Sequence, residues 1–156
     1  MPSIKIETKI FTDIELCFDL SLSIDLHKIS TSKTGEQAID GVTSGLIQLG
    51  QSVTWQAKHL GIKQKLTSKI TALNRLFHFR DEQIKGAFKS FAHDHYFHQF
   101  SGYTLMVDNF HFESPGGIFG HIFNKMILTQ YMENFLKLRN DTIKEYAESD
   151  KWKTIL

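Results

Sequence analysis

Hydrophobic and polar residues alternate along much of this chain with the period of two that half-buried strands have. The first such segment covers residues 4–11, where isoleucines and a threonine alternate with charged residues. Six further strand segments are predicted at 36–41, 52–59, 62–73, 77–85, 90–100 and 103–113. Between the first two strands, Asp13 and Ser23 each precede an apolar run, which predicts the N-caps of two short helices.

Two joints between predicted strands are only two residues long. Leu60-Gly61 separates one pair of strands, and Ser101-Gly102 separates another. Two-residue loops that contain glycine are typical of β-hairpins. Successive hairpins predict an antiparallel meander.

The remainder of the chain has a helical pattern. Residues 114–117 (Ser-Pro-Gly-Gly) end the last strand, and apolar residues then recur at helical spacing from Ile118 to about Glu148. A helix of that length would extend roughly 45 Å. Its first half is apolar on more than one face, so other elements must cover it. We therefore predict one α+β domain over residues 1–149, in which a curved antiparallel sheet wraps a long C-terminal helix, followed by a frayed tail over 150–156.

The hairpin at Ser101-Gly102 determines which side chains share a face. It pairs Phe97 with Met106, His95 with Asp108, His93 with Phe110 and Phe91 with Phe112. The aromatic content of this face predicts that it points inward, whereas the opposite face, with Asp94 and His98, should face solvent. His93, His95 and Asp108 are then inside, with His95 and Asp108 within hydrogen-bonding reach. A polar group on an otherwise apolar inner wall is typical of a ligand pocket.

The composition of the chain argues against some classes of function. The chain has 18 basic and 17 acidic residues, a formal charge of +1, which argues against nucleic-acid binding. No apolar run is long enough to span a membrane or to form a signal peptide, so we expect no stable membrane insertion. The single Cys17 cannot form an intrachain disulfide, which favours a reducing cytoplasm. Thirteen phenylalanines indicate a large aromatic interior.

Several stretches are similar to the bacterial branch of the START-like, helix-grip superfamily, the SRPBCC or polyketide cyclase/dehydrase and lipid-transport group related to birch-pollen allergens. They cover residues 23–28, 50–55, 86–91 and 114–117 and the Arg139-Asn140 pair. The resemblance extends over nearly the whole chain and implies a cavity between sheet and helix. It does not imply one activity, because the superfamily includes lipid carriers, cyclases and chaperone activators.

The inward faces and the helix together define a candidate ligand site. Its residues are Trp55, Leu66, Phe79, Phe91, His93, His95, Phe97, Met106, Asp108, Phe110, Phe112, Phe119, Phe123, Met126, Ile127 and Tyr131. Individually the aromatic residues are more often core than ligand contacts, so the prediction of a pocket rests on the set. His93, His95 and Asp108 have the chemistry of a metal site or an acid/base pair, but a polar anchor for a ligand is favoured, and neither a metal nor another cofactor is predicted.

Three functions remain open. The favoured one is binding of a small hydrophobic molecule such as a lipid, a quinone or an aromatic, polyketide-like compound. An alternative is a cyclase or dehydratase that uses His95 and Asp108 as acid and base. Another is an interaction protein that binds a partner chain or forms a homodimer.

Overall fold

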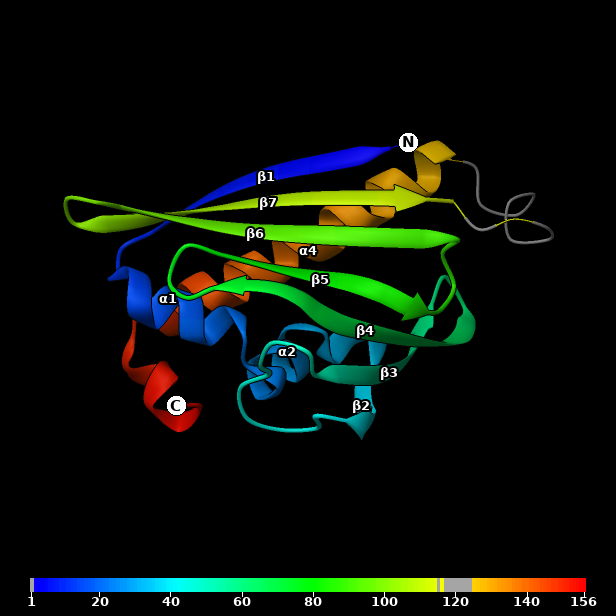
Figure 1. Ribbon diagram of the computed structural model, residues 1–156, viewed down its shortest axis with the longest axis horizontal. Helices are drawn as coiled ribbons and strands as arrows, with labels where there is room; N and C mark the ends of the chain where they lie inside the picture. Colours follow the sequence, from blue (N-terminus) through cyan, green and yellow to red (C-terminus); the bar gives the residue numbers. More distant parts are fainter. Residues whose placement is uncertain (1, 115, 117–124) are drawn as a thin grey trace.

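The computed structural model describes residues 2–114, 116 and 125–156, and within them seven strands form a single antiparallel sheet (Figure 1). The strand order is β1-β7-β6-β5-β4-β3-β2. The strands are β1 (Ser3–Ile10), β2 (Gln37–Gly41), β3 (Ser52–His59), β4 (Ile62–Asn74), β5 (His78–Lys85), β6 (Ser90–Phe100) and β7 (Tyr103–Glu113). The predicted bounds of β3, β6 and β7 match these, and the other four differ by one residue at one or both ends.

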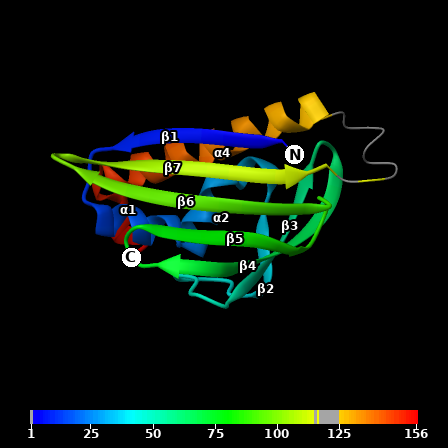
Figure 2. The same ribbon diagram turned by 45° about the horizontal axis from the view of Figure 1, so that its top comes forward.

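The helices lie on one side of the sheet. Two short ones, α1 (Ile14–Ser21) and α2 (Ile24–Ser30), are followed by the 3-10 turn η1 (Ser32–Thr34). The long helix α4 (Lys125–Ala147) runs along the sheet behind β1, β7 and β6, as the views in Figures 1 and 2 agree. This arrangement confirms the α+β helix-grip class. Residues 118–124 of the predicted helix, with the candidates Phe119 and Phe123, lie outside the described residues.

Local sequence signals account for where the short elements begin and turn. The side chains of Asp13 and Ser23 accept hydrogen bonds from the backbone N–H groups of Leu16 and Leu26 at 2.9 and 3.1 Å, so both predicted N-caps are confirmed. In the β3–β4 turn Leu60 and Gly61 both have positive φ, 51° and 81°. Such values are those of the type I′ turns that fit the twist of a hairpin.

Two hydrophobic clusters lie between the sheet and the helices. The larger one joins α1, α2, the end of α4 and the inner faces of β3 to β7, with Cys17 and Phe18 fully buried at its centre. Burial raises the pKa of the Cys17 thiol to about 12. The smaller cluster includes Ile4, Phe112 and Leu128, toward the beginning of α4. The expectation of a frayed C-terminus is wrong, because η2 (Asp150–Thr154) forms there and Trp152 and Ile155 pack against the larger cluster.

The outer face of β6 differs from the prediction at one position. Asp94 was expected to face solvent, yet it is only 4% exposed because two cationic or potentially cationic side chains of β5 cover it. Arg80 donates to both carboxylate oxygens, from Nε at 2.9 Å and from Nη2 at 2.7 Å, and His78 Nε2 lies 2.7 Å from Oδ1. Burial alone would raise the pKa of Asp94, but the hydrogen bonds with Arg80 and His78 lower it to about 2.

This cluster predicts part of the acid sensitivity of the fold. Because the pKa of Asp94 is lower in the folded than in the unfolded chain, its contribution to stability is complete above about pH 4. It is lost as the pH falls toward about 2. Asp94→Asn removes this titration, so we expect its free energy of unfolding to fall less steeply with pH in that window than that of the wild type. Urea unfolding at a series of acidic pH values measures both slopes, and parallel profiles would contradict the assignment.

Candidate functional site

A mostly apolar cavity of about 140 Å³ lies between the sheet and α4. Strands β3 to β7 form one wall, and α4 together with the α1–α2 junction forms the other. A second cavity of about 100 Å³ adjoins it. Both are lined by Glu36, Trp55, Leu66, Phe88, Met132 and Phe135. For scale, a dry apolar cavity of about 150 Å³ holds a benzene-sized molecule.

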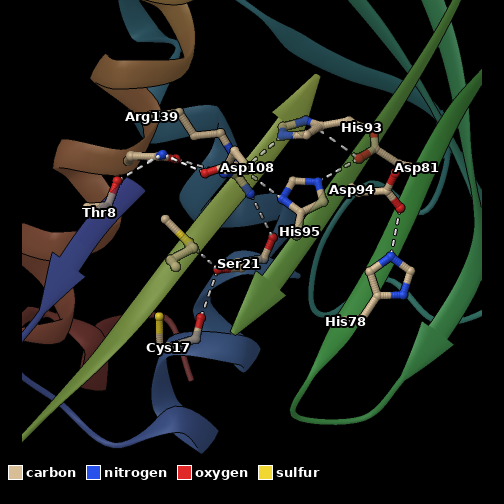
Figure 3. Close-up of polar contacts among 12 residues, drawn as sticks. Thr8, Cys17, Ser21, His78, Asp81, His93, Asp94, His95, Asp108 and Arg139 are labelled. Carbon is tan, nitrogen blue, oxygen red and sulfur yellow. Dashed lines mark hydrogen bonds and ion pairs between the residues drawn. The ribbon is translucent and has the colours of Figure 1, made fainter. Parts of the chain in front are cut away.

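Four titratable side chains from three adjacent strands meet one another (Figure 3), and three of them, Asp81, His93 and His95, line the larger cavity. The register places Asp81 of β5 beside His93 of β6, and His95 of β6 beside Asp108 of β7. Because side chains two apart on a strand share a face, His93 and His95 project inward together. Their rings are 3.7 Å apart between centroids, and both are less than one-tenth exposed.

Each imidazole lies between the two carboxylates. His93 Nε2 is 2.8 Å from Asp108 Oδ1, and His93 Nδ1 is 3.8 Å from Asp81 Oδ1. His95 Nε2 is 2.8 Å from Asp81 Oδ1. His95 Nδ1 is 3.1 Å from Asp108 Oδ1, but the two are not aligned for a hydrogen bond. The predicted proximity of His95 and Asp108 is therefore present, while the aligned hydrogen bond of His95 goes to Asp81.

The charges of this cluster follow from burial and from its contacts. Burial alone would raise the pKa of Asp108, but its contacts with His93 and His95 hold that pKa well below the usual value. Burial lowers the pKa of His93, and the neighbouring His95 lowers it further. Burial also acts to lower the pKa of His95, but the contacts with Asp108 and Asp81 outweigh it and raise that pKa. His93 is thus the neutral imidazole, and its Nε2–H donates to the Asp108 carboxylate.

Helix α4 completes the cluster with two buried polar residues. Asn140 donates from Nδ2 to Asp108 Oδ2 at 2.7 Å and to Thr8 Oγ1 at 3.2 Å. Arg139 lines the larger cavity, with Nη1 3.7 Å from Asp108 Oδ1 and donating to Asn140 Oδ1 at 3.0 Å. Asp108 therefore joins β7, β6 and α4.

A second polar site lies where the two cavities meet. The side chain of Glu36 is 6% exposed, and its Oε2 atom has no hydrogen-bond partner among the described residues. The nearest basic side chain is His27, whose Nε2 lies 3.5 Å from that oxygen and whose ring packs on Trp55. Burial acts to raise the pKa of Glu36, but the contact with His27 lowers it overall. A buried carboxylate oxygen with a free lone pair at a cavity wall suits a hydrogen-bond donor of a ligand.

The smaller cavity has its own polar pair. His59 Nδ1 lies 2.6 Å from the Tyr131 hydroxyl. Burial lowers the pKa of His59 and raises the pKa of Tyr131. The tyrosine therefore keeps its proton, and the two groups share a hydrogen bond whose donor depends on the tautomer of the imidazole.

The structure distributes the candidate residues over several environments. The larger cavity is lined by Trp55, Leu66, Phe79, Phe91, His93, His95 and Phe110, and the smaller one by Trp55, Leu66 and Tyr131. Asp108 lies behind the two histidines. Phe97 and Met106 belong to the larger hydrophobic cluster and Phe112 to the smaller. Met126 and Ile127, near the first described residue of α4, are 79% and 51% exposed.

Four polar residues of the site are not among the candidates that the sequence pattern indicates. Asp81 carried a usable signal, because it lies two residues after Phe79 on the same strand and so shares its inward face. Arg139 and Asn140 were noted only as part of the resemblance. Glu36 was placed at the first position of the predicted strand 36–41, but it precedes β2, so the alternation of that strand does not indicate its direction.

Comparisons with known proteins identify solved structures that share this fold. No family model matches the chain, and no curated protein matches it by sequence. A START superfamily protein from Mycobacterium smegmatis superimposes with a TM-score of 0.71 at 7% identity, covering 94% of this chain and 97% of that one. The protein TTHA0849 from Thermus thermophilus gives 0.70 at 16% identity, covering 94% and 99%. Major latex-like protein 151 from Panax ginseng gives 0.69 at 15% identity, covering 95% and 98%. The START-like helix-grip fold that the resemblance implied is thereby confirmed.

The contacts of Asp108 predict a large effect on stability. Asp108→Asn removes the negative charge that faces Arg139 and the two histidines, and removing one partner of a buried ion pair costs about 3–5 kcal/mol. We expect a loss of that size in the free energy of unfolding, measured with urea at neutral pH. Asp141→Asn, the same change at an exposed position of α4, is the matched control and should alter stability by less than about 0.5 kcal/mol. Equal effects of the two substitutions would contradict the role given to Asp108.

Proposed function

We propose that this protein binds a small hydrophobic molecule in the two adjoining cavities. The observation that carries the proposal is an apolar space between sheet and α4 whose wall presents a buried cluster of His93, His95, Asp81 and Arg139. Apolar walls with a few convergent polar groups are the usual composition of small-molecule sites. The START-like fold supports the proposal, because it places a long helix across a curved sheet and leaves this space between them.

The polar groups specify what the ligand carries. His95 and Arg139 at the cavity wall are donors, so they suit a carbonyl, hydroxyl or carboxylate oxygen of the ligand. Glu36 is an acceptor with an unused oxygen, so it suits a hydroxyl or amine at another point of the same molecule. A ligand that buries about 200 Å² of apolar surface gains roughly 5 kcal/mol from the hydrophobic effect. An oxygenated aromatic, a quinone or a short lipid meets these conditions.

A second candidate function is acid/base catalysis on such a molecule. It is favoured by the position of His95, which faces the cavity and lies between the carboxylates of Asp81 and Asp108. A buried imidazole held by carboxylates can transfer a proton to or from a bound substrate. Turnover of a ligand identified by binding would favour this function over that of a carrier.

Ligand binding is tested by filling the cavity. Ser68 is 7% exposed and lines the larger cavity, so Ser68→Leu adds apolar volume where the ligand would lie. We expect at least a tenfold loss of affinity for anilinonaphthalene sulfonate, followed by its fluorescence. We also expect loss of any organic molecule that co-purifies with the wild type, detected by native mass spectrometry.

The matched control for this substitution is Thr71→Leu, which adds a leucine on the exposed face of the same strand. It should leave both readouts unchanged. Equal binding by the wild type, Ser68→Leu and Thr71→Leu would argue against a ligand in this cavity.

The orienting role of the cluster is tested at His95. His95→Gln keeps a donor toward Asp81 but removes the imidazole ring and shifts the polar group. A hydrogen bond to a charged group is worth about 1.5–3 kcal/mol, so we expect about ten- to hundredfold weaker binding of an oxygenated ligand found by native mass spectrometry. Isothermal titration calorimetry measures the change, and a purely apolar probe of the same size should bind both proteins equally. Unchanged affinity for the oxygenated ligand would contradict the role.

A further inference from the structure

We propose that Asp81, His93 and His95 form a binding site for a divalent transition-metal ion at the wall of the larger cavity. One ligand atom from each of the three side chains lies within 4.8 Å of the others. The distances from Asp81 Oδ1 are 2.8 Å to His95 Nε2 and 3.8 Å to His93 Nδ1. Ligand atoms around a tetrahedral Zn²⁺ ion are roughly 3.3 Å apart, given bonds of about 2.0–2.1 Å. The three atoms therefore need only small side-chain movements to surround an ion.

The groups behind the histidines are those that a metal site requires. An imidazole that binds a metal donates its other N–H to a carboxylate or carbonyl, which fixes the tautomer and the ring orientation. Here Asp108 accepts from His93 Nε2 at 2.8 Å, and this leaves Nδ1 directed toward Asp81 with its lone pair free. His95 Nε2 points to Asp81 at 2.8 Å, and its Nδ1 lies 3.1 Å from Asp108 Oδ1 without an aligned hydrogen bond, so Asp108 supports this ring by proximity alone.

Asp108 is itself held in place for this role. Its second oxygen accepts from Asn140, and the carboxylate is 1% exposed. It therefore contacts both imidazoles from the side away from the cavity, while Asp81, His93 and His95 line the cavity. The two carboxylates thus divide into one ligand and one supporting group.

The charge of the cluster is suited to a cation. The carboxylates of Asp81 and Asp108 together carry two negative charges, and Arg139 supplies one positive charge at the same wall. Together these three groups leave one negative charge at the wall. A divalent ion can offset that charge and bring a bound water or ligand oxygen with it.

The donor set selects the class of metal. Two imidazole nitrogens and one carboxylate oxygen favour Zn²⁺, Fe²⁺ or Co²⁺ over Mg²⁺ and Ca²⁺, which prefer all-oxygen sites. No fourth histidine, cysteine or carboxylate joins the group among residues 2–114, 116 and 125–156. A coordination position therefore faces the cavity, where an oxygen atom of a bound molecule can occupy it. This inference goes beyond ligand binding and does not depend on it.

The test uses the full-length protein after treatment with a chelator, and the metal alone as the probe. Zn²⁺ is titrated by calorimetry, and Co²⁺ is added as a coloured substitute whose visible absorption reports coordination by the protein. We expect one ion per chain and X-ray absorption at the zinc edge that contains imidazole and oxygen scattering. The wild type gives this result without any substitution, so an unstable variant cannot obscure it.

Two substitutions on β5 then locate the ion. Asp81→Asn keeps the size of the side chain and should weaken Zn²⁺ binding about 100-fold or more, because changes to supporting groups alone cost 10–100-fold. Glu82→Gln makes the same chemical change at the next residue, whose side chain points to the other face of the strand, and should bind as the wild type does. Absence of binding to the wild type, or equal affinity of the two variants, overturns the metal site. Either result leaves the proposal of an organic ligand to be decided by the cavity-filling experiment.

Discussion

The interior of this protein depends on the contacts that the buried carboxylate of Asp108 makes. An uncompensated charge in a low-dielectric interior is costly, so the groups around it must be present together. Two histidines of β6 contact it from the sheet, and Asn140 contacts it from α4. The same carboxylate therefore fixes the helix against the sheet and holds the imidazoles in a defined orientation at the cavity wall. Asp108 therefore contributes both to the stability of the fold and to the chemistry of the site.

The cavity follows from how the two hydrophobic clusters divide the interior. The larger cluster fills the end occupied by α1, α2 and the end of α4, and the smaller one lies toward the beginning of α4. Residues of both clusters line the cavity between them, and buried polar groups of the site lie at its wall. The many phenylalanines thus form the walls of a cavity as well as a solid core. The interaction protein that the sequence left open as an alternative does not require such a cavity.

The sequence predicted the parts of the fold that short-range rules determine. The two-residue turn at Ser101-Gly102 fixed the β6–β7 register, and hence the pairing of His95 with Asp108. Asp81 meets the histidines across the β5–β6 pair, and the four-residue connection between these strands does not set their register as a two-residue turn does. The sequence also did not show that Arg139 and Asn140 reach the site, because packing, and not hydropathy, sets the rotation of α4 about its axis.

None of the described helices is long and apolar enough to cross a membrane.

The environment of Cys17 has a practical consequence for studying this interior. Only the thiolate form of cysteine attacks alkylating reagents, and a thiol that titrates near 12 and is fully buried is almost entirely protonated and inaccessible in the native state. Modification must then wait for the packing around α1 to open. The rate at which Cys17 is alkylated under native conditions therefore reports how often the larger cluster opens. A small molecule that slows this alkylation would be shown to occupy the interior without any spectroscopic label.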